Sequence, residues 1–289
     1  MILAIGITLA FLAMLCWGFG DFLIQKSTRK FGDVETLFLI SLFGAIILFP
    51  FIYLNLLEVM QSSKQLLILI VTSLLLLVAA LLDFEALKRG KLVVVEPIYA
   101  LEIPIASFLA FFIVKETIST TQTALIVSLV VGLILVSLKG SHFTKKVWLE
   151  KGVILVLLGT LFMGGTNFMV GIGSRAAGPL MVNWFIATFT AIICIVIMIK
   201  NKRLSFVKHL RKNKKLLISM CLLDNIAWVA FAFAMTIAPI SIAVALSESY
   251  ILIAALLGIY INKELLKKHQ IVGLGLAIIS AITLAAITI

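Results

Sequence analysis

The sequence predicts an all-α membrane protein with ten transmembrane helices, arranged as two inverted five-helix repeats. The first observation is composition, because hydrophobic residues make up 63% and charged residues 13% of the 289-residue chain. Together with a mean hydropathy of +1.23, this lies far outside the balance of a water-soluble domain. The second is a series of ten apolar runs, each near the roughly 20 residues that a helix needs to cross a bilayer. The third is a set of short motifs that recur in order in both halves.

The ten runs leave little of the chain outside the membrane. Irregular backbone cannot face lipid, and the runs are too long and uninterrupted for barrel strands, so each is predicted to be a helix. No Lys or Arg precedes the first run, and no small-residue cleavage pattern follows it before Asp21 and Lys26, so we interpret it as a span and not a signal peptide. The predicted spans are residues 2–25, 35–56, 66–87, 91–114, 119–138, 147–172, 179–199, 215–237, 239–262 and 269–288.

Basic residues are distributed unevenly among the connections. Those in or beside the odd-numbered loops number 3, 3, 4, 8 and 3, against 1, 1, 1 and 0 for the even-numbered loops. Cytoplasmic loops are the ones enriched in Lys and Arg, so we expect the odd loops in the cytoplasm and both chain ends on the far side. The densest loop, 200–215, has no aromatic interleaving beyond Phe206, which favours a topology signal or anionic-lipid contact over nucleic-acid binding.

The two halves share motifs at a nearly constant offset. ASFLAFFIVKET (106–117) matches AALLGIYINKEL (254–265), and Ala86 matches Ala234, both at an offset of 148. WGFGDF (17–22) matches MGGTNF (163–168) at an offset of 146. Because each half holds five spans, the second half must enter the membrane from the opposite side. We therefore expect a first repeat over 1–140 and a second over 147–289.

With these motifs the chain resembles the EamA family of the drug/metabolite transporter superfamily. The resemblance implies a membrane transporter, although members are usually drawn with both termini in the cytosol, contrary to the charge count. Span 9 departs from the pattern, since it has no proline and Tyr250 stands where the first half has Glu102. The positions that match are Trp17, Gly18, Ala86, Glu102, Pro104, Glu116, Gly132, Ala234, Glu264 and Gly273.

Metal, cofactor and enzyme sites are not predicted. Cys16, Cys194 and Cys221 lie within spans, as buried small hydrophobic residues do. The three histidines, at 142, 209 and 269, lie in connecting loops, so a membrane-embedded metal site or histidine base lacks its residues. No cofactor is expected, and an intramembrane enzyme lacks a convincing nucleophile and base.

Acidic residues inside the spans are the main functional signal, because charges there are costly and no basic residue lies near a span centre. They predict a negative or protonatable pathway that suits a cationic or zwitterionic amine, proton coupling, or both. Asp83 and Glu85 lie close to Lys88 and Arg89, which favours an interfacial ion pair. Asp21 lies about a turn from its expected helix end, either as a polar terminus or as a pathway entrance. The seven acids are Asp21, Asp83, Glu85, Glu96, Glu102, Asp224 and Glu248.

The stretch EPIYALEIP (96–104) is the sharpest of these signals. On a helix, Glu96, Tyr99 and Glu102 fall within one 120° arc and form a polar stripe. Pro104 cannot donate to the carbonyl of Ala100, so span 4 should kink and expose a polar spot near mid-membrane, unless the prolines only curve the helix. Deep carboxylates such as Glu102, Asp224 and Glu248 each need a partner inside the bundle or a proton.

Aromatic and small residues complete the expected site. Trp228 and Phe231 follow Asp224 at i+4 and i+7, as either an aromatic wall for a cationic amine or core packing. GIGSRAAG (171–178) resembles a phosphate loop but has no preceding strand, so we interpret it as a turn. The expected substrate-binding or coupling residues are Glu102, Tyr99, Glu96, Asp224, Trp228, Glu248, Tyr250, Asp21, Trp17 and Asn167.

These features predict a secondary transporter in the cell membrane. Its expected substrate is a small polar metabolite, such as an amine or amino acid, exported by proton coupling or exchange. A flippase for a lipid-linked metabolite, which needs a lateral opening, is the alternative, and an intramembrane enzyme is a more remote one. The expected partners are the substrate, protons and the lipid bilayer, without nucleic acid.

Overall fold

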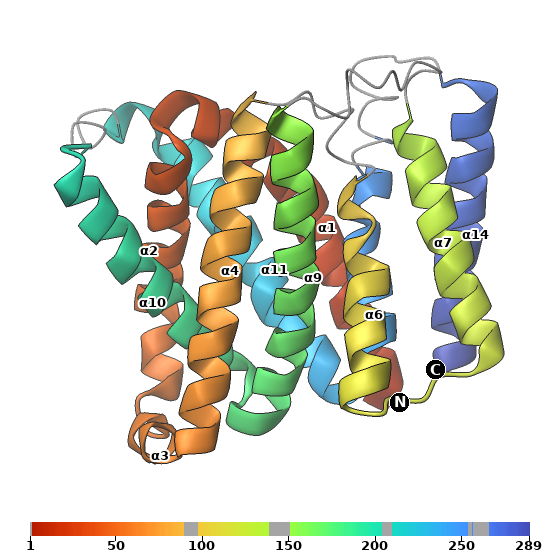
Figure 1. Cartoon of the computed structure of the whole chain (residues 1–289), viewed down its shortest axis with the longest axis horizontal. Helices are drawn as coiled ribbons and strands as arrows, with labels where there is room; N and C mark the ends of the chain where they lie inside the picture. The colour runs from red at the N-terminus through yellow and green to blue at the C-terminus, as the bar shows by residue number, and fades with distance from the viewer. Residues whose placement is uncertain (1, 90–97, 139–150, 204–209, 254–255, 257–265) are drawn as a thin grey trace.

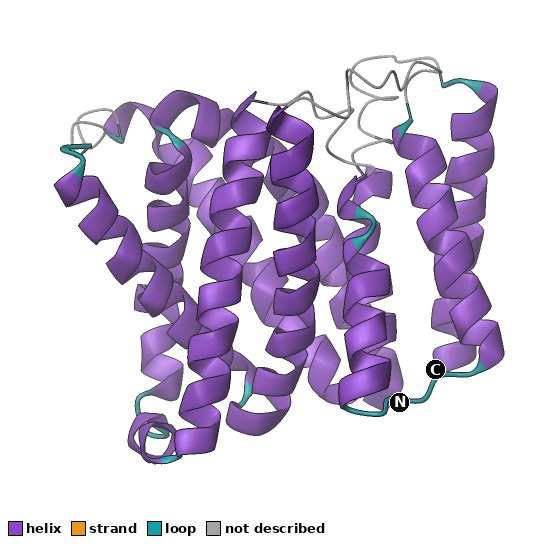
Figure 2. Ribbon diagram, in the orientation of Figure 1, coloured by secondary structure: helices purple, strands orange, loops and turns teal. Residues whose placement is uncertain are grey.

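The computed structural model describes residues 2–89, 98–138, 151–203, 210–253, 256 and 266–289. Within these ranges the chain is helical and contains no strand, as Figure 2 shows. The helices, labelled in Figure 1, are α1 (Ile2–Phe31), α2 (Asp33–Ile52), α3 (Leu56–Gln61), α4 (Ser63–Arg89), α6 (Glu102–Ile113), α7 (Thr120–Ser137), α9 (Lys151–Ala177), α10 (Pro179–Lys200), α11 (Lys214–Ile237), α12 (Ile240–Ser247) and α14 (Lys268–Thr288), with 3-10 turns η2 (Arg211–Asn213) and η3 (Glu248–Tyr250).

Eight of these helices are long and apolar enough to cross a bilayer, and they correspond to predicted spans 1, 2, 3, 5, 6, 7, 8 and 10. Predicted spans 4 and 9 appear as two shorter apolar helices, Glu102–Ile113 and Ile240–Ile253. Before the first of these helices and after the second, the predicted spans also include 91–101 and 254–262, of which the structure describes only 98–101 and 256. The all-helical membrane architecture is thus confirmed.

The packing of the helices repeats between the two halves of the chain. The most extensive contacts join α1 to α11, α4 to α9, α2 to α10, and α7 to α14. Exchanging the halves converts the first of these pairs into the second and leaves the other two unchanged. Figure 1 shows α1 rising from the N-terminus while its counterpart α9 descends, so the repeat is inverted.

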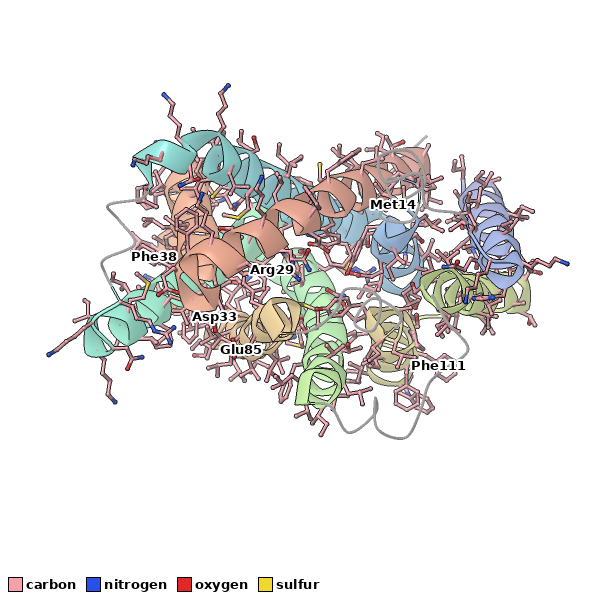
Figure 3. All side chains as sticks on the ribbon, turned by 90° about the horizontal axis from the view of Figure 1, so that it is seen from above. Met14, Arg29, Asp33, Phe38, Glu85 and Phe111 are labelled. Carbon is pink, nitrogen blue, oxygen red and sulfur yellow. The ribbon has the colours of Figure 1, made fainter. Side chains whose placement is uncertain are left out.

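The two ends of the bundle differ in chemistry. Both chain termini lie at one end, which we call the termini end (Figure 1). The opposite end, which we call the basic end, contains the α1–α2 junction, where Arg203 forms ion pairs with Asp33 (3.7 Å) and Glu35 (4.0 Å). Figure 3 looks down on the basic end and labels Arg29, Asp33 and Glu85 there.

Lipid-facing and helix-facing surfaces are clearly separated. Phe111 points away from the bundle in Figure 3 and is 55% exposed, as expected for a side chain in contact with lipid. Between α7 and α14 the backbones approach closely, because a Cβ on Gly273 would come within 2.8 Å of the carbonyl oxygen of Gly132. Small residues that allow such close approach are typical of helix packing in membranes.

Two predicted boundaries were wrong in the same way. Helix α1 continues to Phe31, well past the expected end at residue 25, and the Ser27 hydroxyl hydrogen-bonds with that of Thr36 at 3.0 Å. Helix α9 likewise runs through GIGSRAAG to Ala177, where Gly178 (φ 95°) ends it, so this segment is helix and not a turn. In both cases the helix extends into the interface, where hydropathy no longer marks it.

Candidate functional site

Glu102 lies where span 4 is interrupted. Residues Ala100 and Leu101 form a turn, and α6 begins at Glu102. The distortion expected from Pro104 is therefore present, with Pro104 in the first turn of α6, where a missing N–H costs little. Helical bonding resumes as the Ile105 N–H donates to the Leu101 carbonyl at 3.3 Å.

Glu248 lies at a similar interruption in span 9, which contains no proline. Helix α12 ends at Ser247 and passes into the 3-10 turn Glu248–Tyr250. Here the hydroxyls of Ser247 and Ser249 donate to the carbonyls of Ala243 (2.8 Å) and Ala245 (2.7 Å), a pattern that bends helices. The two halves thus place one carboxylate each at a helix break.

Asn167 joins these two carboxylates. Its amide nitrogen donates to Glu102 Oε2 and to Glu248 Oε1, each at 3.1 Å. All three side chains are almost fully buried, with exposed fractions of 3% for Glu102, 5% for Glu248 and 1% for Asn167. Because α9 and η3 belong to the second half and α6 to the first, this hydrogen-bonded cluster links the repeats.

The cluster forms part of the wall of one cavity of about 140 Å³ between the two halves. Side chains from α1, α2, α4, α6, α9, α10, α11 and η3 face it. Most of them lie between mid-height and the basic end of the bundle. The polar and aromatic lining residues are Trp17, Asp21, Ser41, Asp83, Phe84, Tyr99, Glu102, Asn167, Asn183, Asp224, Asn225, Trp228, Glu248 and Tyr250.

The charge on this wall has one sign. Five carboxyl groups face the cavity, whereas the described lining residues include no Lys, Arg or His. In the described part of the chain, no three His, Cys, Asp or Glu side chains converge on a site that could hold a metal ion. The cavity therefore concentrates acidic groups that no described basic side chain on its wall offsets.

Aromatic rings form one side of the cavity. Trp17 contacts the three other rings of this group in edge-to-face arrangements. Its ring centroid lies 5.2 Å from those of Trp228 and Phe231 and 6.4 Å from that of Tyr250. Trp17, Trp228 and Tyr250 line the cavity, whereas Phe231 is fully buried behind them. Both interpretations of Trp228 and Phe231 are thus realised, as wall and as core.

Nine of the ten side chains expected at the site line this single cavity. The tenth, Glu96, lies outside the described residues. Asp21 is one of the nine, and it lies ten residues before the end of α1, so it is deeper than the expected terminus would place it.

Asp83 lies deeper than the interfacial position predicted for it. It is only 6% exposed, faces the cavity, and its Oδ1 has no hydrogen-bond donor in the described part of the chain. The interfacial prediction depended on the i,i+4 spacing of Glu85 and Arg89, but Asp83 lies on the cavity wall, six residues before the end of α4. Sequence reasoning also missed Ser41, Asn183 and Asn225. An inspection of every side-chain amide within an apolar span would have identified the two asparagines.

A separate polar network lies at the termini end of the bundle. Glu116 accepts hydrogen bonds from the N–H groups of Ile240 (2.8 Å) and Ser241 (2.9 Å) and from the Ser241 hydroxyl (2.9 Å). Arg175 donates to the carbonyls of Met235 (2.8 Å) and Ala238 (3.1 Å) and lies 3.6 Å from Glu116. We call Glu116, Arg175 and Ser241 the clasp, because they tie the ends of α9, α11 and α12 to the segment after α6.

Comparison with known proteins agrees with this architecture. The curated proteins compared give no match. One solved structure, described only as a crystal structure of a protein, aligns over 98% of this chain and 97% of that chain, with a TM-score of 0.76 and 12% identity. That likeness shows a shared fold. The family model described as the EamA-like transporter family matches residues 4–138 and again 150–286, and by this double match, one for each half, the chain belongs to the EamA-like transporter family.

Proposed function

We propose that the protein is a secondary transporter that moves a small amine or amino acid across the cell membrane, as an exporter driven by proton coupling or exchange. The observation that carries the proposal is the cavity between the inverted halves, lined by five carboxyl groups and by no basic residue among its described lining. Inverted-repeat transporters place their substrate sites between the repeats near mid-membrane, often beside broken helices. Glu102 and Glu248 have that placement.

Exchange between a proton and an amine follows from the same groups. A carboxylate that holds a cationic amine by a charged hydrogen bond can instead hold a proton, so each displaces the other. The cavity lies toward the basic end, while the clasp lies at the termini end. Release to the far side would require the clasp to open, and binding would favour whichever conformation it fits better.

Transport is tested with purified protein in liposomes, a panel of radiolabelled amines and amino acids, and an imposed pH gradient. We expect flux of at least one cationic amine that rises with the gradient and collapses with a protonophore. Asp224→Asn and Glu248→Gln should lose the response to the gradient while some substrate exchange survives. Glu58→Gln, which removes an exposed acid in α3, is the matched control. Absence of amine flux, or an unchanged gradient response in both cavity variants, would reject the proposal.

Orientation is tested separately. We propose that the basic end faces the cytoplasm, because 21 of the 24 Lys and Arg residues lie in or beside the odd loops. Single cysteines at Ile2 and Asn213, in a background without Cys16, Cys194 and Cys221, would be exposed to a membrane-impermeant thiol reagent on whole cells. Labelling at position 2 but not at 213 is expected, and the reverse pattern would show the opposite orientation.

A further inference from the structure

The hydrogen-bond donors of the cavity wall are largely committed to the protein itself. Three asparagines face the cavity, and each amide nitrogen carries two hydrogens. Asn167 donates to Glu102 and Glu248, both at 3.1 Å. Asn183 donates to the carbonyls of Pro179 (2.8 Å) and Trp228 (3.3 Å). Asn225 donates to the carbonyls of Cys221 (2.9 Å) and Ile40 (3.2 Å), so all six amide hydrogens are used.

The orientation of these amides is fixed by their partners. Four of the six partners are backbone carbonyls, which can only accept, so the nitrogens of Asn183 and Asn225 must face them. Glu102 and Glu248 likewise only accept from Asn167 while they are ionised. The Asn225 amide oxygen packs against Gly44 of α2. Asn167 Oδ1 is buried and has no hydrogen-bond partner in the described part of the chain.

A carboxylate entering this cavity would lack suitable partners. Its negative charge would meet five carboxyl groups, and no basic side chain among the described lining residues would offset them. The other donors on the wall are single neutral groups, namely hydroxyls and indole N–H groups. A charge buried without a partner is strongly disfavoured.

An ammonium group finds the opposite situation. It brings three donors and no acceptor, which matches a wall that carries five carboxyl groups. The Trp17 and Tyr250 rings beside Glu248 provide aromatic faces of the kind that attract cations. The volume also limits the ligand, since about 140 Å³ is close to the roughly 150 Å³ cavity that holds one benzene molecule.

From this arrangement we infer that the cavity takes small amines without a carboxylate and rejects the corresponding amino acids. This inference rests on the proposed function and narrows it from amines and amino acids to amines. The selective element is the full commitment of the asparagine hydrogens of Asn167, Asn183 and Asn225.

Binding to the full-length purified protein tests the inference with four ligands. Pentylamine is norleucine without its carboxylate, norleucinamide has the size of norleucine without the negative charge, and lysine has the net charge of pentylamine but retains the carboxylate. We expect pentylamine and norleucinamide to bind at least about tenfold more tightly than norleucine and lysine, measured by isothermal titration calorimetry.

Each other outcome overturns the inference. Norleucine or lysine binding as tightly as norleucinamide would show that a carboxylate is accepted. Weak binding of norleucinamide beside tight binding of pentylamine would show that size alone selects. If none of these ligands or of the wider amine panel binds, the proposed function fails together with the inference, whereas tight binding of amino acids rejects the inference and leaves the proposed function standing.

A variant pair tests the physical cause. Asp224→Asn removes one negative charge from the wall and adds an amide with hydrogens of its own. The preference for norleucinamide over norleucine should therefore fall severalfold, to about threefold or less. Glu58→Gln removes an exposed charge in α3 and should keep the wild-type preference. An unchanged preference in Asp224→Asn would contradict the assigned cause.

Discussion

The carboxylates at the termini end and those in the cavity differ in how many hydrogen-bond partners the described part of the chain gives them. At the termini end, the Glu116 side chain is 10% exposed, accepts three hydrogen bonds and lies 3.6 Å from Arg175. In the cavity, Glu102 and Glu248 share one neutral amide, and Asp83 has an oxygen without a donor in the described part of the chain. Glu116 thus has its hydrogen-bond and charge partners within the protein, which we call the complete set. Among the described residues the cavity carboxylates have fewer partners, and we call them the incomplete set.

The difference separates structural from binding roles. Glu116 lies at the N-terminus of α12, where a negative charge is favourable, and Arg175 lies at the C-terminus of α11, where a positive charge is favourable. Each charge there satisfies backbone groups that a helix end leaves unpaired. Among the described residues the cavity carboxylates cap no helix end, which is the arrangement that the proposed amine site requires.

The largest expected effect breaks the complete set. Glu116→Ala removes the acceptor of three hydrogen bonds at once and leaves Arg175 without its counter-ion, so the free energy of unfolding should fall by about 3 kcal/mol. Glu116→Gln keeps one acceptor oxygen and should lose less. Denaturant unfolding in detergent measures both changes. Amine affinity of the surviving protein should stay within about twofold, and a much larger loss of affinity would place the clasp in the binding site.

Next in size is the matched change in the incomplete set. Glu102→Gln keeps an acceptor for Asn167 but removes a charge, so stability should change by less than about 1 kcal/mol. Amine affinity should fall about tenfold or more, since charged hydrogen bonds contribute about 1.5–3 kcal/mol. Calorimetric titration of monodisperse protein measures the loss. Wild-type affinity in this variant would remove Glu102 from the site.

A smaller effect tests the placement of Asp83. A Cβ on Gly159 would overlap Asp83 Oδ1, whereas a Cβ on Gly165 in the same helix would come no closer than 3.8 Å to Leu75. Gly159→Ala should therefore push the Asp83 side chain aside and lower stability by about 1–2 kcal/mol. Gly165→Ala should be neutral or stabilise by up to about 1 kcal/mol. Equal effects of the two substitutions on unfolding would contradict the close contact.

The smallest expected effect concerns the exposed member of the clasp. The Arg175 side chain is 38% exposed, so solvent screens its attraction to Glu116. Arg175→Lys keeps the charge but loses the planar geometry that reaches two carbonyls, and should cost about 0.5–1 kcal/mol, less at high salt. Unfolding at two salt concentrations measures this. A loss of unfolding free energy as large as that of Glu116→Ala would show that Arg175 contributes most of the stability of the clasp.

The sequence predicts the fold well because the bilayer imposes a simple rule on helix length and polarity. The ten apolar runs and the inverted repeat follow from that rule, and the rarity of charge inside spans points to Glu102, Asp224 and Glu248. Hydropathy does not predict how deep a given side chain lies within the bundle. Asp21 is deeper than predicted because α1 continues beyond the apolar run, and Asp83 is buried although basic residues follow it closely in the sequence. The break at Glu248 has no proline that could predict it.

The partners of each polar group were also beyond the sequence. Asn167 was expected at the site, but only the structure shows its nitrogen between Glu102 and Glu248. In the clasp, Glu116 contacts Ile240 and Ser241, which follow it by 124 and 125 positions in the chain. No local sequence pattern can predict contacts over such a separation. Arg175 lay in a segment interpreted as a turn, which hid its position at the end of a helix.

The crossed pairing of the helices has a consequence for biosynthesis. Each of the most extensive helix contacts joins a helix of the first half to one of the second, so α1, α2, α4 and α7 have their main neighbours in sequence that is translated later. Until the second half has been translated and inserted, most of the surfaces that bury these helices do not exist. The nascent first half must therefore wait in the bilayer, and a truncated product would offer unpaired helix faces to quality control.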